Sequence, residues 1–308
     1  MKIFSGSSNK PLAEAICRNL NIPLGKIYLH TFPSQEKYVQ FQENIRGEDI
    51  FIIQSLSNPA NDNLMELLVM TDAARRASCG KITIVCPWMA YSRCERKDKP
   101  RVPISAKLVL DMIEQAGVDR IISVDLHSPS IQGFTNNPFD NLYVMPLLLK
   151  SLPKKDIVII APDAGAVKRN EILARVSNAG FAFIAKKRVN DTDVEAKGFV
   201  GDVKDKIAVI CDDLTESCGT IIEASKVCKE NGAKEIWALI SHPMFTDIGI
   251  QRINNDTTLN GIITTNSIPL REPNVKINVV DISPMLAEAI RRTTSNESIS
   301  ELFEIKGF

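Results

Sequence analysis

The sequence predicts an α/β protein of two similar doubly wound domains, each with a mainly parallel central sheet. Short apolar, β-branched runs alternate with longer segments of helical period along nearly the whole chain, the pattern of parallel strands joined by helices. Each run is apolar throughout, as expected of strands covered on both faces. The predicted strands are residues 50–53, 82–85, 121–124, 157–160, 181–184, 207–210 and 236–240.

A long-period repeat supports the division into two domains. In both halves a strand is followed by a polar loop, a helix, a Gly, a Lys, a second strand and a Pro, with the helices predicted at 64–77 and 221–229. We therefore expect an N-terminal domain of residues 1–143 and a C-terminal domain of residues 144–308. The tail from about residue 286 is expected to pack back on the N-terminal domain.

Charge and composition exclude several classes of partner. The 308 residues carry 37 Lys and Arg against 37 Asp and Glu, so the formal net charge is zero. This balance gives no bulk attraction to nucleic acid or to an anionic membrane, and neither partner is expected. No apolar run approaches the ~18 residues of a spanning helix, and the N-terminus lacks the pattern of a signal peptide. We expect a cytoplasmic protein.

The seven cysteines are odd in number, scattered and never spaced as CxxC. This spacing indicates neither a disulfide framework nor a zinc site. Most of the cysteines are expected to be small buried thiols.

Polar clusters that directly follow predicted strands are the candidate sites, because ligands bind beyond the carboxyl ends of strands in open α/β sheets. The most specific cluster runs from Asp212 to Thr220. Small hydroxyl residues and Gly219 at a helix start leave backbone N–H groups for a phosphate, and Asp212 and Asp213 can accept hydrogen bonds from two vicinal hydroxyls. The run predicts a ribose 5-phosphate site. A capped helix with surface acids is the alternative, which a lone Asp pair would favour.

Two further clusters follow strands. Asp125 and His127 precede an open loop, and Asp163 lies in a turn that contains Pro and Gly. Because Mg²⁺ takes few protein ligands beside water and phosphate oxygens, these groups indicate contacts with a Mg²⁺-bound phosphate. An isolated His is more often a hydrogen-bonded structural residue, and such turns are common, so a structural role stays open for each.

Two basic segments are a further signal, residues 93–101 and residues 186–188. Basic runs of this kind usually form a charged surface that faces solvent. The second run, however, leads into a polar stretch, Val189 to Gly198, that lacks clear periodicity. We interpret this stretch as a mobile lid that brings cations over a reacting phosphoryl group.

Several motifs occur together along nearly the whole chain, from Phe4 to Ser300: residues 46–49, 99–107, 125–127, 131–134, 201–203 and 212–220. They closely resemble those of the ribose-phosphate pyrophosphokinases, also called phosphoribosyl pyrophosphate (PRPP) synthetases. The resemblance implies two phosphoribosyltransferase-like domains. It also implies transfer of the β,γ-pyrophosphoryl group of ATP to the C1 hydroxyl of ribose 5-phosphate, which gives PRPP and AMP for nucleotide biosynthesis.

The resemblance implies roles for individual residues. The implied cofactor is Mg²⁺, held by His127 and Asp163 with Asp125 and Asp140 as helpers. The implied catalytic cations are Lys186 and Arg188. The implied ATP contacts are Phe32, Ser34, Glu36, Arg93, Cys94 and His127. The implied ribose 5-phosphate contacts are Arg188, Asp212, Asp213, Glu216, Ser217, Cys218, Gly219 and Thr220.

The resemblance further implies a homo-oligomer built from dimers, a hexamer being one such assembly. Phosphate activation and ADP inhibition at a subunit junction are also implied, with matching residues at Arg46, Arg101, Ser298 and Ser300.

The chain departs from the family pattern at five positions: Cys94 replaces Gln, Glu216 and Asn136 replace Asp, Ser217 replaces Thr, and Ala166 replaces Gly. The alternatives are a phosphoribosyltransferase and a non-catalytic regulatory subunit. The duplicated architecture and the 125–127 motif argue against the former, and the intact basic residues at 186 and 188 argue against the latter.

Overall fold

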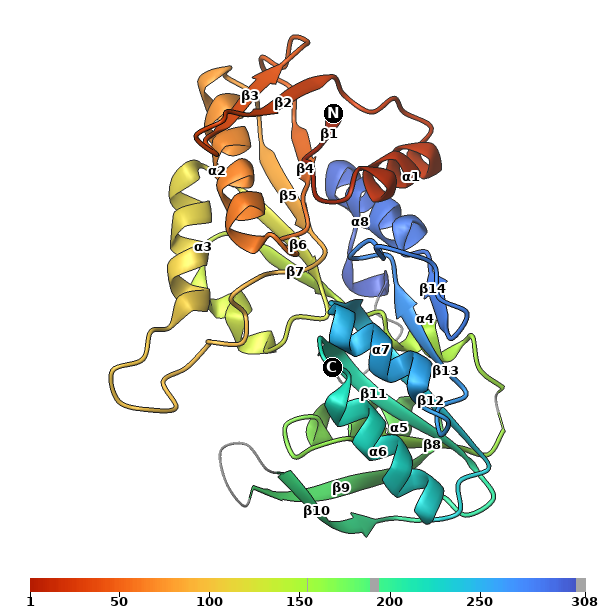
Figure 1. Ribbon diagram of the computed structural model, residues 1–308. Coiled ribbons are helices and arrows are strands. Elements are labelled where there is room, and N and C mark those ends of the chain that lie inside the picture. The colour runs from red at the N-terminus through yellow and green to blue at the C-terminus, as the bar shows by residue number, and fades with distance from the viewer. Residues whose placement is uncertain (154, 189–193, 303–308) are drawn as a thin grey trace. The chain divides into compact units, whose positions relative to one another are not determined.

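The computed structural model describes residues 1–153, 155–188 and 194–302, and the chain divides into two compact units (Figure 1). Unit 1 comprises residues 1–143, 267–269 and 281–302. Unit 2 comprises the described residues of 144–266 and 270–280. The C-terminal part of unit 1 therefore starts at Asp281, a few residues before the position suggested by the sequence.

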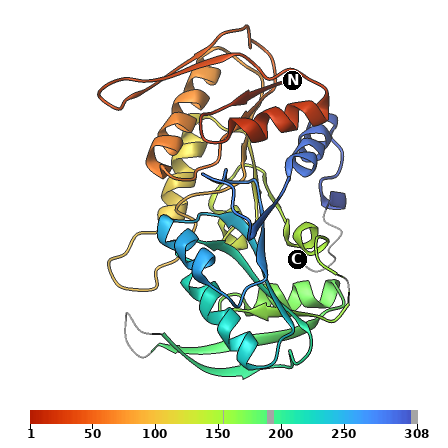
Figure 2. The ribbon, with the colours of Figure 1, turned by 45° about the vertical axis from the view of Figure 1, so that its right-hand side comes forward.

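Unit 1 is built on a parallel sheet of order β1-β4-β5-β6-β7. Helices α2 and α3 cover one face of this sheet, and α1 and α8 lie side by side on the other (Figures 1 and 2). A hairpin of β2 and β3 packs against α2. The bounds are β1 (Lys2–Ser5), α1 (Lys10–Leu20), β2 (Ile27–Thr31), β3 (Lys37–Phe41), β4 (Ile50–Ile53), α2 (Ala60–Arg76), β5 (Ile82–Cys86), α3 (Ser105–Ala116), β6 (Arg120–Val124), η1 (Pro129–Phe134), β7 (Phe139–Leu142), α8 (Ser283–Ser295) and η2 (Ser300–Leu302).

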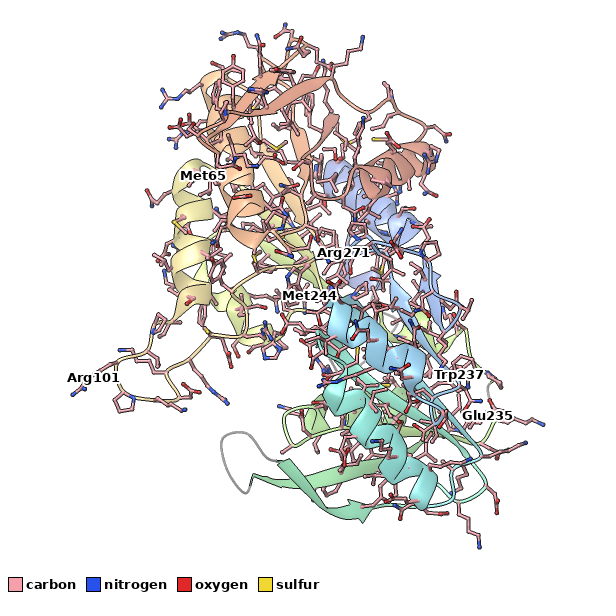
Figure 3. All side chains as sticks on the ribbon, viewed as in Figure 1. Met65, Arg101, Glu235, Trp237, Met244 and Arg271 are labelled. Carbon is pink, nitrogen blue, oxygen red and sulfur yellow. The ribbon has the colours of Figure 1, made fainter. Side chains whose placement is uncertain are left out.

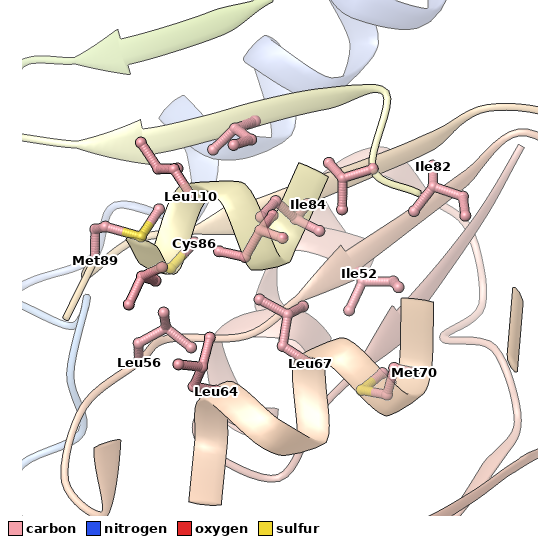
Figure 4. Close-up of a cluster of buried hydrophobic side chains, with 14 of the residues drawn as sticks. Ile52, Leu56, Leu64, Leu67, Met70, Ile82, Ile84, Cys86, Met89 and Leu110 are labelled. Atoms are coloured by element: carbon pink, nitrogen blue, oxygen red, sulfur yellow. The ribbon is translucent and has the colours of Figure 1, made fainter. Parts of the chain in front are cut away.

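The core of unit 1 lies between this sheet and helices α2 and α3. Ile52 and Ile84 on the sheet pack with Leu67 of α2 and Leu110 of α3, and all four side chains are fully buried (Figure 4). The buried positions of α2 recur every three or four residues, so one stripe of this helix faces the sheet.

Unit 2 has a sheet of order β10-β9-β8-β11-β12-β13-β14, which is parallel except for the antiparallel β9–β10 pair. Helices α6 and α7 cover one face, and α4 and α5 lie on the other (Figure 1). The bounds are α4 (Met145–Leu149), β8 (Ile157–Ala161), α5 (Val167–Val176), β9 (Gly180–Arg188), β10 (Val194–Val200), β11 (Ile207–Thr215), α6 (Gly219–Glu230), β12 (Glu235–Pro243), α7 (Asp247–Asn255), β13 (Gly261–Thr265) and β14 (Ile277–Val280).

The α/β class and the seven strands expected from the sequence are confirmed, as β4, β5, β6, β8, β9, β11 and β12. The prediction missed the hairpin β2–β3, whose exposed and half-buried residues alternate, and several short strands at or near the sheet edges. The expectation of irregular backbone up to Gly198 is wrong for residues 194–198, because these residues belong to β10 (Val194–Val200), which pairs with β9. Residues 189–193 of the expected lid lie outside the described residues.

No helix in the described part of the chain combines the length and apolarity needed to cross a membrane. The seven cysteines are free, and five of them are buried, as the sequence analysis expected.

We expect Leu67→Ala to lower the free energy of unfolding of unit 1 by about 2–5 kcal/mol, because a fully buried side chain would leave a cavity. Met65→Ala on the same helix is the control, since Met65 is half exposed and its loss should cost about 0.5 kcal/mol or less (Figure 3). Urea unfolding followed by Trp88 fluorescence in a Trp237→Phe background reports on unit 1. Equal losses for the two variants would contradict the assignment of Leu67 to the core.

Candidate functional site

Two adjacent carboxylates of β11 share one guanidinium nitrogen in unit 2. The Nη2 atom of Arg169, on α5, donates to Oδ1 of Asp212 at 3.0 Å and to Oδ1 of Asp213 at 3.2 Å. The parallel pairing of β8 with β11 makes this contact possible, because α5 begins just beyond the carboxyl end of β8. The shared cation reduces the repulsion between two carboxylates that the sequence assigned to sugar hydroxyls.

The site carries more negative than positive charge. Burial raises the pKa of Asp212 well above its usual range, and repulsion from Asp213 raises it further, while Arg169 partly offsets both effects. The carboxylate of Asp163, in the turn after β8, contributes to the same repulsion. Among the side chains that the structure describes, three carboxylates therefore influence this region beside the guanidinium of Arg169, and a bound cation or hydroxyl donors would relieve the imbalance.

The loop after β11 leads into a helix whose N-terminus has backbone N–H groups without partners in the helix. Cys218 stands before α6 in the left-handed region, with φ of 58°, and no side chain among the described residues caps this helix. Since the first N–H groups of a helix have no partner within it, those at the start of α6 are available to an anion. A left-handed residue within such a loop also creates the concave arrangement of N–H groups called a nest.

The exposure of the loop residues decides which of the predicted ribose 5-phosphate contacts a side chain can make. Ser217 and Thr220 are exposed, and Glu216 and Gly219 are half-buried, so all four are accessible to a ligand. The Cys218 side chain is fully buried among apolar residues, and burial raises its pKa to about 11. A direct contact of Cys218 with ligand therefore has to use its backbone N–H.

Residues with the right donor chemistry for Mg²⁺ are present. Within the described residues, no group of three or more His, Cys, Asp and Glu is clustered as a ready-made metal cage. Mg²⁺ is commonly held by one or two carboxylates together with substrate phosphates and water, so isolated carboxylates fit it. Asp163 meets this description, and its Oδ1 accepts the N–H of Ala166 at 3.1 Å, which fixes the carboxylate in the turn.

The other metal candidates lie in unit 1. Asp125 follows β6, is buried and has a φ of 36°, a conformation that is costly for a residue with a side chain and is often found at functional sites. His127 is exposed two residues later. Asp140, by contrast, lies opposite Ile122 within the sheet and forms an ion pair with Arg120, so a structural partner already engages its charge.

The predicted ATP contacts of the hairpin surround an exposed ring. Phe32, just after β2, is 41% exposed and makes edge contacts with His30 and Tyr38 at 5.0 and 5.9 Å between ring centroids. In the hairpin loop, the hydroxyl of Ser34 donates to the carboxylate of Glu36 at 2.6 Å. An accessible aromatic ring beside hydrogen-bonding groups is a suitable surface for a nucleobase.

The remaining predicted ATP contacts of unit 1, Arg93 and Cys94, are exposed in the loop between β5 and α3.

Of the predicted regulatory residues, Arg46 lines a cavity of about 390 Å³ formed with β3 and α2. Arg101 projects from the β5–α3 loop (Figure 3). The carbonyl of Ser298 accepts from Nη1 of Arg292 at 2.7 Å, and Ser300 starts η2.

Lys186 and Arg188 lie on β9, where the backbone pairs them with Ala196 and Val194 of β10. The positions of their side chains lie outside what the structure describes.

Sequence reasoning gave no role to Arg169 or to Arg252 of α7, which contacts the loop after β11. Arg169 lies in the first turn of α5, soon after Asp163, and a basic residue at that place could have drawn attention to it. Arg252 is 35 residues from its partner Ser217 and gave no local signal.

Comparisons with known proteins agree along the whole chain. The sequence model of the N-terminal domain of ribose phosphate pyrophosphokinase matches residues 1–117, and that of the phosphoribosyl synthetase-associated domain matches residues 189–304. The chain is 44% identical over 310 residues to ribose-phosphate pyrophosphokinase A of Dictyostelium discoideum, with 98% of each chain covered. It is similar to the crystal structure of phosphoribosylpyrophosphate synthetase from Mycobacterium smegmatis, with a TM-score of 0.90, 35% identity, and coverage of 96% of this chain and 99% of that one.

We expect Arg169→Met to destabilise unit 2 by about 3–5 kcal/mol at pH 8.5 without metal, because it leaves buried carboxylates without their cation. Because the pKa of Asp212 is raised in the folded protein, the native state binds the proton of this carboxyl more tightly than the unfolded state does. The free energy of unfolding therefore falls as the pH rises above about 4, the pKa of an Asp in the unfolded chain. Removal of Arg169 raises that pKa further, so the loss should be smaller at pH 5, where Asp212 is protonated in both proteins.

Urea unfolding followed by Trp237 fluorescence in a Trp88→Phe background measures this difference. Arg271→Met is the matched control, since Arg271 is exposed and pairs with the exposed Asp247. Losses of equal size at the two pH values would mean that Arg169 contributes packing and not charge compensation.

Proposed function

This chain belongs to the ribose-phosphate pyrophosphokinase family, and on that premise we propose that it transfers the β,γ-pyrophosphoryl group of ATP to ribose 5-phosphate. The C1 oxygen of the sugar bonds to the β phosphorus, and the bond from that phosphorus to the oxygen bridging the α-phosphate breaks. AMP leaves with the bridging oxygen, the C1 hydroxyl proton passes to solvent, and PRPP is formed. The arrangement of Asp212 and Asp213 directly before the N–H-rich loop is the observation that carries this proposal.

The sugar substrate fits the chemistry of unit 2. Asp212 and Asp213 are hydrogen-bond acceptors for vicinal ribose hydroxyls, and Arg169 holds the two carboxylates near each other. The backbone at the start of α6 supplies N–H donors and a helix N-terminus for the 5-phosphate. Acceptors for a diol followed by donors for a phosphate match the two ends of ribose 5-phosphate.

The nucleotide is assigned to residues of unit 1. The exposed ring of Phe32 stacks on the adenine, and Ser34, Glu36, Arg93 and Cys94 supply polar contacts. Family membership supports Mg²⁺ as the cofactor. Its candidate ligands are His127 and Asp125 in unit 1 and, separately, Asp163 in unit 2, whereas Asp140 already pairs with Arg120. When bound, Mg²⁺ supplies charge neutralisation on the phosphate oxygens.

Lys186 and Arg188 are assigned as the catalytic cations. Negative charge builds up on the transferring group and on the leaving AMP, and fixed cations stabilise this charge most in the transition state. A homo-oligomeric assembly, a cytoplasmic location and regulation through Arg46, Arg101, Ser298 and Ser300 stay predictions of the sequence.

We expect the purified chain to release AMP from ATP only when Mg²⁺ and ribose 5-phosphate are both present, because the sugar hydroxyl is the acceptor. Separation of the products by chromatography, with ribose and with ADP as control substrates, measures this dependence. AMP release at the same rate with and without ribose 5-phosphate would contradict the proposal. Consumption of PRPP together with a free base, without net PRPP synthesis, would instead indicate a phosphoribosyltransferase.

We expect Lys186→Ala to lower kcat by about 10²–10³-fold and to change both KM values by less than about threefold, because its charge acts mainly in the transition state. Lys187→Ala, at the neighbouring position of β9, is the control and should retain most activity. Steady-state kinetics with ATP and ribose 5-phosphate varied separately gives both parameters. A rise in KM with unchanged kcat would remove Lys186 from the catalytic step.

A further inference from the structure

Residues at the start of and within helix α7 donate hydrogen bonds to two backbone carbonyls of the loop after β11. The Glu216 carbonyl accepts the N–H of Thr246 at 3.0 Å and its hydroxyl at 3.2 Å. The next carbonyl, that of Ser217, accepts Nη1 of Arg252 at 3.0 Å. A Cβ atom on Gly249 would lie 2.2 Å from the Glu216 oxygen, so helix and loop meet at backbone distance. Two consecutive peptide groups are thus tied to one helix.

These ties determine where the loop N–H groups point. A trans peptide is planar, with its C=O and N–H directed to opposite sides. Because the carbonyls of Glu216 and Ser217 point toward α7, the N–H groups of Ser217 and Cys218 point away from it. Together with the free N–H groups at the start of α6, they are placed to donate to one anion.

Arg252 is the charged member of this support. Its side chain is exposed, and a Cβ atom on Gly219 would lie 3.0 Å from its Nη1, so the guanidinium stands at the N-terminus of α6. The other ties come from Thr246, which also caps α7 through the N–H of Gly249 at 3.2 Å. Helix α7 therefore keeps its own cap and its tie to Glu216 when Arg252 is replaced.

We propose that Arg252 is a positioning residue for the 5-phosphate of ribose 5-phosphate, acting through the carbonyl of Ser217. This inference rests on the proposed function, because it takes the loop as the phosphate site. Arg252 fixes the Ser217–Cys218 peptide so that its N–H faces the phosphate, and a freely rotating peptide would lose this donor. The effect falls on sugar binding, while the triphosphate and the transfer step do not depend on this peptide.

The test compares Arg252→Met with Arg252→Gln, two side chains of similar length that differ in a hydrogen-bond donor. Arg252→Met should raise the KM for ribose 5-phosphate by about tenfold, the value of one hydrogen bond from a charged group. The KM for ATP and kcat should change by less than about twofold. Arg252→Gln should lie closer to the wild type, because its amide can still donate to the Ser217 carbonyl.

Arg271→Met is the matched control, because Arg271 also contacts α7, through Asp247 at 3.2 Å, but is bonded to no residue of the loop in the structure described (Figure 3). It should leave all three parameters unchanged. Equal impairment of the Met and Gln variants would show that the donor to Ser217 is not what matters and would overturn the proposal. An equal rise in the KM for ATP, or a lower kcat with unchanged KM, would also overturn it.

Calorimetric titration with ribose 5-phosphate, and with ribose as the phosphate-free control, separates this inference from the proposed function. Tighter binding of ribose 5-phosphate to the wild type than to Arg252→Met supports the positioning role even if AMP is never released. AMP release by the wild type with the same ribose 5-phosphate affinity in both proteins supports the proposed function and overturns the role of Arg252.

Discussion

The shared contact of Arg169 with Asp212 and Asp213 is the interaction on which the proposed sugar site depends. Two neighbouring carboxylates in a largely buried position repel each other, and burial further disfavours their charged forms. One guanidinium nitrogen within 3.2 Å of both reduces that cost and fixes the acceptors relative to each other. The remaining carboxylate charge supports the proposal that this site binds hydroxyl donors and a hard cation.

The proposed phosphate end of the site depends on backbone geometry instead of charge balance. The α7 helix holds two loop carbonyls, and the uncapped start of α6 supplies N–H donors beside them. The side chain of Cys218 is buried in the core, so only its backbone can face a ligand, whereas Glu216, Ser217 and Thr220 stay accessible.

Much of the fold and of the candidate site was predictable for a local physical reason. Strands covered on both faces are apolar throughout, so the central strands of both sheets were found from the sequence. The β2–β3 hairpin and edge strands such as β7 were missed because they carry mixed residues. The buried strand β13 was also missed, since it starts with Gly and ends with two Thr. The candidate residues at strand ends were found because parallel sheets place ligands there, whereas Asp140 proved to lie within a strand beside Arg120.

The zero net charge and the order of apolar runs and polar clusters were enough to determine an α/β protein that holds anionic substrates by local groups. The tertiary structure alone decided which groups act together. Arg169 meets Asp212 across 43 residues of sequence, and Arg252 meets Ser217 across 35. Such contacts arise from strand register and helix packing, which depend on the whole fold, so no local pattern in the chain could have identified the partners of these two residues.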